Sequence, residues 1–269
     1  MRIRTGFEIA FDCPQPTPMM LMLSIHPERD NDLVTPDTIR TDPDVPVHTY
    51  LDGFGNRCTR LVAPAGRLTV TTDALVVDSG ELDVVIPDAQ QAEVQDLPDD
   101  TLVYLLGSRY CDTDRMSDIA WNLFGNAPLG WGRVKAICDF AHGRIAFNYQ
   151  NAHSERTAFD GYTQRTGVCR DFAHLAITLC RCMNIPARYC TGYLGDIGVP
   201  KDTAPMDFSA WFEAYLDGRW YTFDARHNRP RIGRILMARG RDAADVALSN
   251  TFGPNQLAVF KVWTDEVAA

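Results

Sequence analysis

A cysteine stands at residue 169, where loop-like sequence changes into helix-like sequence within RTGVCRDFAHLAITLC (165–180). Gly167 lets the chain turn sharply just before it, and Cys169 then falls at the first helical positions. Free N–H groups and the helix dipole favour an anion there, which lowers the pKa of a thiol. The same N–H groups can hold an oxyanion. The pattern predicts a thiol nucleophile for acyl transfer, and its alternative is a half-buried residue that starts the helix.

A nucleophilic thiol requires a base, and the base requires a group that orients it. In the stretch DFSAWFEAYLDGRWYTFDA, the pair Asp217-Gly218 predicts a tight hairpin turn. With a two-residue turn, Trp211 faces Asp224, and Ser209 is the diagonal neighbour of Asp224 on the same face of the sheet. A carboxylate at 224 is thus placed to orient whatever stands at 209. A histidine at 209 would complete a Cys-His-Asp set, and the sequence has serine there.

The elements that must position these residues follow from the hydrophobic period of the sequence. An apolar stripe predicts a helix from about 169 to 183, which Asn184 and Pro186 end, and a strand from Ala187 onward. Two earlier helices are predicted within 115–125 and 130–147, the second with a stripe of Val134, Ile137, Cys138 and Ala141. The first hundred residues instead indicate short strands separated by turns, and the polar segment 89–100 is a candidate linker.

Three blocks, TGVCRDFAHLAI, IPARYCTGYL and DFSAWFEAYLDGRWYTFDARHN, resemble the core blocks of the transglutaminase-like superfamily of bacterial candidate cysteine proteases. The resemblance covers most of residues 101–269, and the first hundred residues resemble the β-rich domain that often precedes this core. It implies an α+β fold. A papain-like transglutaminase core at 101–269, with a Cys-bearing helix packed on an antiparallel sheet, would follow a β-sandwich-like domain at 1–100.

By position, the resemblance implies that Cys169 is the nucleophile and Asp224 the acid of the family. The family histidine precedes Ala-Trp, and Ser209 occupies its place. A serine hydroxyl is not a general base near neutral pH, and loss of the base of such a triad costs on the order of 10³- to 10⁶-fold in rate. Three outcomes stay open. Another histidine supplies the imidazole, the thiolate acts without a base on an activated acyl group, or the fold is a binding module that has lost catalysis.

Four histidines outside the first hundred residues are candidates for the missing base. His227 follows the hairpin and can swing back towards it, which makes it the first candidate. His153 lies on a loop upstream of the Cys helix and can border the cleft. His174 is on the Cys helix itself, roughly 140° around the axis from the thiol, which favours a packing role. His142 ends a helix, where a C-terminal cap is the simplest interpretation.

Two functions therefore compete. The first is a thiol-dependent acyl-transfer enzyme, of the peptidase, amidase or transglutaminase type, that hydrolyses or exchanges a peptide or amide bond. The second is a catalytically degenerate module that binds a peptide or a protein partner. Trp211 and Glu213, on the hairpin face, and Tyr162, just before the Cys block, are candidate substrate-binding residues. The arginines between 226 and 241 are interpreted as ion pairs with an acidic surface.

Composition and net charge limit the classes of partner and the cellular compartment that we expect for this protein. A net charge of −9 and a pI of about 5.1 argue against a nucleic-acid or anionic-membrane partner. No apolar run is long enough to span a membrane, and we expect a cytoplasmic protein. Its 8 cysteines are then expected to be reduced, and they form no CxxC pair, so no metal site is expected. No nucleotide loop or haem signature occurs, and we expect no cofactor.

Overall fold

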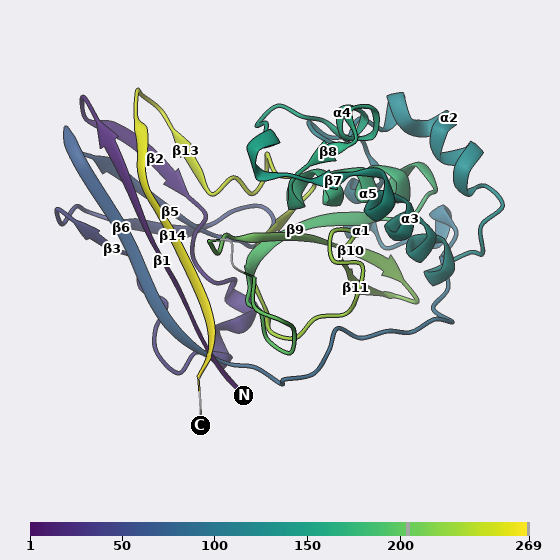
Figure 1. Cartoon of the computed structure of the whole chain (residues 1–269), viewed down its shortest axis with the longest axis horizontal. Helices are drawn as coiled ribbons and strands as arrows, with labels where there is room; N and C mark the ends of the chain where they lie inside the picture. The colour runs from purple at the N-terminus through teal and green to yellow at the C-terminus, as the bar shows by residue number, and fades with distance from the viewer. Residues whose placement is uncertain (203–204, 268–269) are drawn as a thin grey trace.

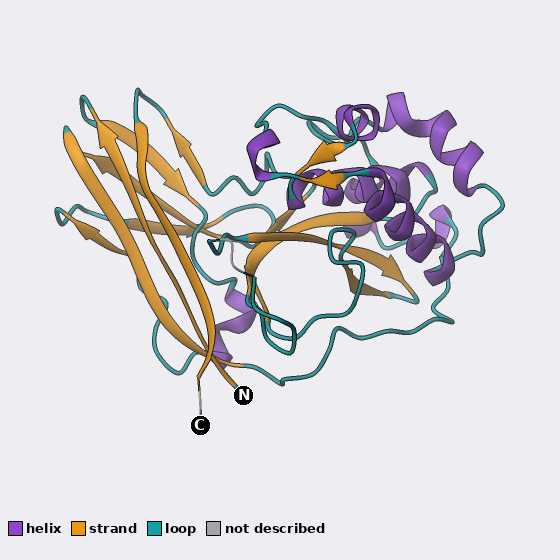
Figure 2. Ribbon diagram, viewed as in Figure 1, coloured by secondary structure: helices purple, strands orange, loops and turns teal. Residues whose placement is uncertain are grey.

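The computed structural model describes residues 1–202 and 205–267 of the chain. A strand-rich region and a helix-bearing region lie side by side, and both chain ends lie at one edge of the strand-rich region (Figure 1). The helices gather almost entirely in the second region (Figure 2). The short 3-10 helices are η1 (Pro27–Asp32), η2 (Val94–Asp96), η3 (Val103–Leu105) and η4 (Tyr149–Asn151).

Within the described residues, the strand-rich region consists of two four-stranded sheets with the orders β14-β1-β6-β3 and β13-β2-β5-β4. Apolar side chains on alternate positions of β1, β2, β5 and β6 form one buried cluster, as expected for strands with one face turned to a core. The bounds are β1 (Arg2–Cys13), β2 (Thr17–Leu21), β3 (Arg40–Asp42), β4 (His48–Leu51), β5 (Arg57–Ala63), β6 (Gly66–Val77), β13 (Ser249–Thr251) and β14 (Gln256–Val267). The predicted strand-rich N-terminal region is confirmed.

Two strands of this region come from the end of the chain. β14 is antiparallel to β1, with Arg2 opposite Val267, and β13 is antiparallel to β2. The strand-rich region therefore includes residues 249–267, which the sequence alone placed with the helices. The domain boundary at residue 100 stays a prediction. Segment 78–98 connects β6 to the helices as a long, mostly extended stretch of chain (Figure 1).

The helix-bearing region is built on an antiparallel sheet with the order β11-β10-β9-β12. Its strands are β9 (Ala187–Leu194), β10 (Ser209–Leu216), β11 (Arg219–Phe223) and β12 (Arg234–Gly240). The remaining elements are α1 (Asp99–Leu102), α2 (Thr113–Phe124), α3 (Trp131–Arg144), α4 (Ala158–Gln164), α5 (Cys169–Cys182), β7 (Ala146–Phe147) and β8 (Thr166–Gly167). A helix that carries the cysteine and packs on an antiparallel sheet is the architecture that the resemblance implies, and it is confirmed.

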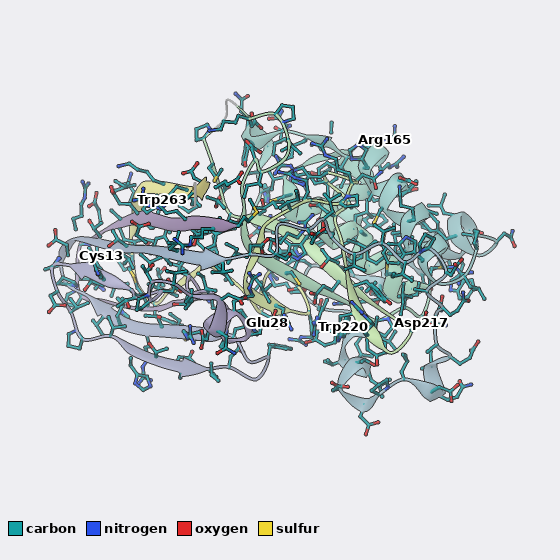
Figure 3. All side chains as sticks on the ribbon, turned by 90° about the horizontal axis from the view of Figure 1, so that it is seen from below. Cys13, Glu28, Arg165, Asp217, Trp220 and Trp263 are labelled. Carbon is teal, nitrogen blue, oxygen red and sulfur yellow. The ribbon has the colours of Figure 1, made fainter. Side chains whose placement is uncertain are left out.

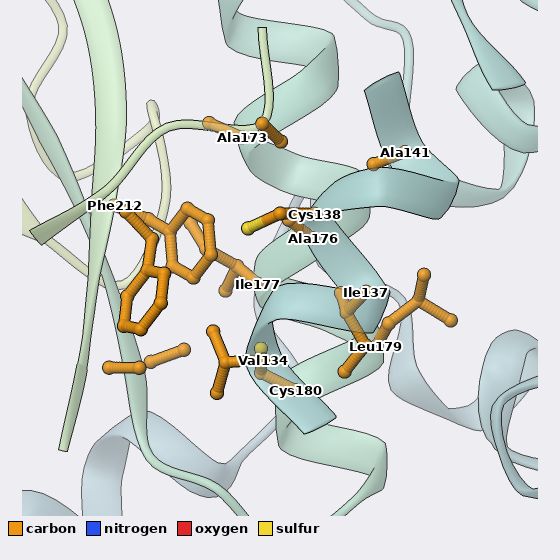
Figure 4. Packing of buried hydrophobic residues seen from close by; sticks show 14 of the residues in the cluster. Val134, Ile137, Cys138, Ala141, Ala173, Ala176, Ile177, Leu179, Cys180 and Phe212 are labelled. Atoms are coloured by element: carbon orange, nitrogen blue, oxygen red, sulfur yellow. The ribbon is translucent and has the colours of Figure 1, made fainter. Parts of the chain in front are cut away.

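The face of α5 that meets the sheet is fully apolar. Ala173, Ala176 and Ile177 of α5 lie near Phe212 of β10, and α3 packs beside α5 (Figure 4). The predicted α3 stripe of Val134, Ile137, Cys138 and Ala141 is buried in the same cluster. Because each buried Ile or Phe side chain contributes about 1.5–3 kcal/mol, this packing fixes α5, and with it the cysteine, relative to β10.

The predicted hairpin and its register are confirmed. Phe212 lies opposite Phe223 and Leu216 opposite Arg219, as a two-residue turn requires. Both turn residues have positive φ, 45° at Asp217 and 76° at Gly218, which matches the Asp-Gly preference of this turn type. Figure 3 shows this turn and Trp220 on the helix-bearing side of the molecule, well away from Cys13.

Two further observations concern the cysteines and the membrane. All eight cysteines are free, and every one except Cys169 is buried. Most of them are thus small apolar residues of the core, as the sequence predicts. Among the described residues, no helix combines the length and the hydropathy that a bilayer crossing requires.

Candidate active site

Cys169 is the first residue of α5, as the sequence predicts, and three neighbours hold it there. The Asp171 carboxylate accepts the N–H of Val168 at 2.8 Å and so caps the helix. Gly167 is required for this cap, because a Cβ at 167 would lie 2.5 Å from Asp171 Oδ2. Asp171 is only 1% exposed, and Arg156 pairs with it at 3.2 Å. The start of α5 is thus fixed by a buried ion pair beside the cysteine.

Cys169 lines a cavity of about 530 Å³ at the boundary between the two regions of the molecule. The cavity walls come from α5, from the strands β9 and β10, from the loop before α4, and from the segment that leads into β13. Its lining includes Tyr110, His153, Arg170, Tyr189, Asp207, Phe208, Ser209, Ala210 and Leu248. A cavity of this size admits a side chain together with a short piece of peptide backbone.

Cys169 is only partly buried as a residue, but loss of hydration around its sulfur raises the pKa of the thiol to about 11. Arg226 lowers this pKa, Asp207 raises it, and hydrogen bonds from the backbone N–H groups of Ala210 and Arg170 lower it. The sequence predicted a lowered pKa, and this prediction was wrong in direction. The N–H groups at the helix start are present, but loss of hydration around the sulfur outweighs them. The thiol therefore keeps its proton at neutral pH.

Ser209 is the first residue of β10 and lines the same cavity as Cys169. It is 7% exposed and lies opposite Gly192 of β9. Its side chain borders both the Cys169 cavity and a second cavity of about 110 Å³, which His227 and Tyr149 also line. Ser209 thus occupies the junction between the two cavities.

Asp224 follows directly after β11 and is buried among hydrogen-bond donors. Its Oδ1 accepts the N–H groups of Arg226 at 3.0 Å and His227 at 2.9 Å. Its Oδ2 accepts Arg234 Nη2 at 3.0 Å. Burial alone raises the pKa of this carboxyl, but Arg234 and His227 outweigh burial and hold the pKa far below its usual range. Asp224 is therefore ionised at every physiological pH.

His227 is the histidine that Asp224 orients. Its Nδ1 lies 2.8 Å from Asp224 Oδ2, and because an ionised carboxylate only accepts, Nδ1 carries the proton. The Nε2 atom of the neutral ring is then the free acceptor. The sequence named His227 as the first substitute base, and the structure brings it to Asp224 and to the cavity that it shares with Ser209.

The other three histidines have different surroundings. His153 borders the Cys169 cavity, but its Nδ1 accepts the N–H of Glu155 at 3.3 Å, which places the ring proton on Nε2. His174 is fully buried, is stacked on Tyr110, and accepts the N–H of Ala243 at 3.2 Å, so its predicted packing role is confirmed. His142, in the last turn of α3, bonds the carbonyl oxygen of Arg226 through Nδ1 at 2.8 Å.

The structure does not bring the three predicted substrate-binding residues to the thiol. Trp211 packs with Cys190 and Leu236 on the sheet face opposite α5. Glu213, on that same face, pairs with Arg188 at 2.6 Å. Tyr162, on α4, packs into the helical core, where Arg144 lies over its ring. Trp211 and Glu213 lie on the odd-numbered face of β10, opposite the even-numbered residues that α5 covers. Ser209 shares this odd-numbered face and borders the cavity of Cys169 from the first position of the strand.

Two charged residues at the site were not recognised from the sequence as site residues. Asp207 lines both cavities, and Arg226 lines the second one and stacks on the ring of Phe147, 3.9 Å from its centroid. The strand alternation that relates 207 to 209 is a signal that could have identified Asp207. Among residues 1–202 and 205–267, no group of three or more His, Cys, Asp or Glu side chains is arranged to hold a metal ion.

Comparison with known proteins agrees with this geometry. Residues 120–225 match the family model of the transglutaminase-like superfamily. The crystal structure of a candidate cysteine protease from Cytophaga hutchinsonii superposes with a TM-score of 0.84 at 30% identity, over 100% of this chain and 91% of that chain. An uncharacterized protein of Mycobacterium leprae (strain TN) is 29% identical over 231 residues, 78% of this chain and 77% of that protein. The similarity extends across both regions of the molecule.

Proposed function

Because the chain belongs to the transglutaminase-like superfamily, we propose that it is a thiol-dependent acyl-transfer enzyme that hydrolyses or exchanges a peptide or amide bond. Cys169 is the nucleophile, and a peptide or a protein supplies the acyl group. In place of the family histidine, the imidazole of His227 is the base, Asp224 orients it, and the Ser209 hydroxyl lies between the base and the thiol.

The observation that carries the proposal is the position of Ser209. This residue borders the cavity of Cys169 on one side and the cavity of His227 on the other. A hydroxyl both donates and accepts a hydrogen bond. Ser209 can therefore pass a proton from the Cys169 thiol to the imidazole of His227, which borders the second cavity. Asp224 keeps His227 in the tautomer that leaves Nε2 free to accept.

The reaction then proceeds in two stages. In the first, the Cys169 sulfur attacks the carbonyl carbon while its proton moves through Ser209 to His227 Nε2, and the leaving amine takes that proton as the C–N bond breaks. The N–H groups of Ala210 and Arg170, which already bond the sulfur, are the donors nearest to the oxyanion. In the second stage, water or an amine attacks the thioester and returns the proton to the thiol.

The raised pKa of Cys169 makes the base necessary. A thiol whose pKa is about 11 is almost entirely protonated at pH 7, so attack requires that the proton leaves in the same step. The proposal therefore predicts a strong dependence of the acylation rate on His227, which a preformed thiolate would not show.

The test uses a tryptic peptide pool as acyl donor and hydroxylamine as acceptor, with products identified by mass spectrometry. Wild-type protein should form hydroxamates or hydrolysed peptides and a thioester on Cys169. Cys169→Ala should form none, and His227→Gln should react about 10²- to 10⁴-fold more slowly. His48→Gln, at an exposed position of β4, is the matched control and should retain wild-type rates. Turnover by Cys169→Ala, or equal rates for wild type and His227→Gln, would overturn this mechanism.

The second candidate function is a catalytically degenerate module that binds a peptide or protein partner. The poorly hydrated, protonated thiol of Cys169 and the serine at 209 favour it. In the same assay, this function predicts peptides that are retained by the protein unchanged, with no thioester on Cys169.

A further inference from the structure

We propose that Asp207 recognises a cationic side chain, an ammonium or a guanidinium, that the acyl donor carries beside the attacked carbonyl, and that this pairing activates Cys169. The inference rests on the proposed role of Cys169 as nucleophile. The inference adds a substrate class, acyl donors with a cationic side chain. It also adds a mode of activation, in which the Cys169 thiol becomes reactive when the cation pairs with Asp207.

Asp207 differs from four other acidic residues around the site, because each of those four forms an ion pair with an arginine. Asp171 pairs with Arg156, Asp224 with Arg234, Glu213 with Arg188 and Asp196 with Arg231. Within residues 1–202 and 205–267, no lysine, arginine or histidine nitrogen forms an ion pair with Asp207. One of its oxygens accepts the N–H of Phe208 at 2.7 Å, and the carboxylate otherwise lines the cavity. Burial raises the pKa of Asp207, and Arg226, which forms no ion pair with this carboxylate, opposes the rise only in part. A cationic ligand would offset the remaining cost of the half-buried carboxylate.

The cavity suits a long basic side chain. Tyr110 and Tyr189 line it together with Asp207 and Cys169. Lysine and arginine bury their methylene stems against such apolar walls and keep the charged head at a polar group. A substrate whose carbonyl lies at Cys169 can therefore place its stem along the rings and its head at Asp207.

The same carboxylate acts on the thiol. Asp207 raises the pKa of Cys169, whereas Arg226, whose guanidinium stacks on Phe147, lowers it. Pairing Asp207 with a ligand cation removes the repulsion and leaves Arg226 unopposed, so thiolate forms more readily. The other titratable or charged groups around the sulfur are Tyr149 on η4, His153 on the following loop, Arg170 and Asp171 on α5, and Tyr189 on β9.

The test measures alkylation of Cys169 by iodoacetamide at pH 8 and constant ionic strength, followed by mass spectrometry of the Cys169 peptide. The probes are n-butylguanidinium chloride and its neutral analogue n-butylurea. Butylguanidinium should accelerate alkylation of the wild type. Asp207→Asn should by itself raise the rate about 10-fold, as expected when removal of a neighbouring negative charge lowers the pKa of a thiol by about one unit. Butylurea should have no effect.

Two control variants complete the design. Asp207→Glu keeps the charge and should retain both slow alkylation and the response to butylguanidinium. Asp196→Asn removes a carboxylate that lines the second cavity only, and should behave as the wild type. The inference is overturned if Asp207→Asn reacts no faster than the wild type, or if butylguanidinium accelerates Asp207→Asn equally. Neither result affects the thioester assay on Cys169, so failure of the cation site and failure of the enzyme are distinguishable.

Discussion

Nδ1 of His227 lies 2.8 Å from the Asp224 carboxylate, and a single tight turn beyond β11 joins the two residues. The turn is closed by the N–H groups of Arg226 and His227, which both bond Asp224 Oδ1. Asp224 therefore orients an imidazole from its own loop, whereas the family arrangement takes the imidazole from the adjacent strand, where this chain has Ser209. An imidazole therefore lies beside Asp224 in this chain, although residue 209 is serine.

Restoring the family residue tests this arrangement. Ser209→His would place an imidazole at the junction of the cavity of Cys169 and the cavity of His227. We expect an imidazole there to lower the pKa of the thiol and to raise the acylation rate by about 10²-fold or more, because proton transfer becomes direct. The measurement is thioester formation with the peptide pool. Ser209→Ala, as the matched control, should lower the rate by removing the relay.

An unchanged rate for both Ser209 variants would show that position 209 takes no part in proton transfer. A rate increase in Ser209→His that persists in Ser209→His/His227→Gln would assign the gain to the new imidazole alone.

The pH dependence of Cys169 alkylation should reflect burial of the sulfur. Because the pKa is raised to about 11, thiolate forms only as the pH approaches that value. At pH 8 we expect native Cys169 to react with iodoacetamide on the order of 100-fold more slowly than the same residue in urea-unfolded protein, whose thiol titrates near 8.5. Mass spectrometry of the Cys169 peptide gives both rates. A native midpoint at or below 8.5 would contradict the burial argument.

Asp224 should contribute to stability in a pH-dependent way. Its pKa is lowered in the folded protein, so its contribution is complete above the unfolded value of about 3.9 and is lost as the pH falls below it. Asp224→Asn leaves the buried Arg234 with Asp83 as its remaining partner, at 2.9 Å, and should cost about 2 kcal/mol or more at pH 7. Urea unfolding of both proteins at pH 7, 5 and 3 measures the difference.

The expected pattern is a difference in unfolding free energy that is equal at pH 7 and pH 5 and smaller at pH 3. A difference that grows as the pH falls would mean that Asp224 is protonated in the folded protein, and it would remove the orienting role assigned to this carboxylate.

Gly167→Ala should destabilise the start of α5. The new Cβ would lie 2.5 Å from Asp171 Oδ2, and the buried ion pair with Arg156 prevents the carboxylate from moving away. We expect a loss of about 1–3 kcal/mol, as for other overpacked buried positions. Gly143→Ala is the control, because a Cβ at residue 143 would meet nothing within 4 Å and alanine is favoured in a helix. Thermal unfolding should show opposite shifts for the two variants.

The local sequence pattern was sufficient to predict the helix and the hairpin that carry the site. The apolar stripe that follows Cys169 and the breakers Asn184 and Pro186 specify α5 almost to the residue, because a helix that packs on a sheet must repeat its apolar positions every 3.6 residues. The turn at Asp217-Gly218 specifies the hairpin register, because positive φ at both positions admits few other turns. Both signals are local, and both predictions were confirmed.

Tertiary structure decided the features of the site that depend on contacts between distant segments, which a local sequence pattern does not specify. Which face of β10 meets α5 depends on packing between distant segments, and it separates Trp211 and Glu213 from the thiol. The hydration of the Cys169 sulfur depends on every element that surrounds it, and this reversed the expected pKa shift. The pairing of β14 with β1 joins the ends of the chain, which no periodicity within either strand specifies. The sequence by itself determined the positions of α2, α3, α5 and the β10–β11 hairpin and the identity of the nucleophile candidate. Only the fold decided which charges face that nucleophile, because electrostatic environment and burial are properties of long-range contacts.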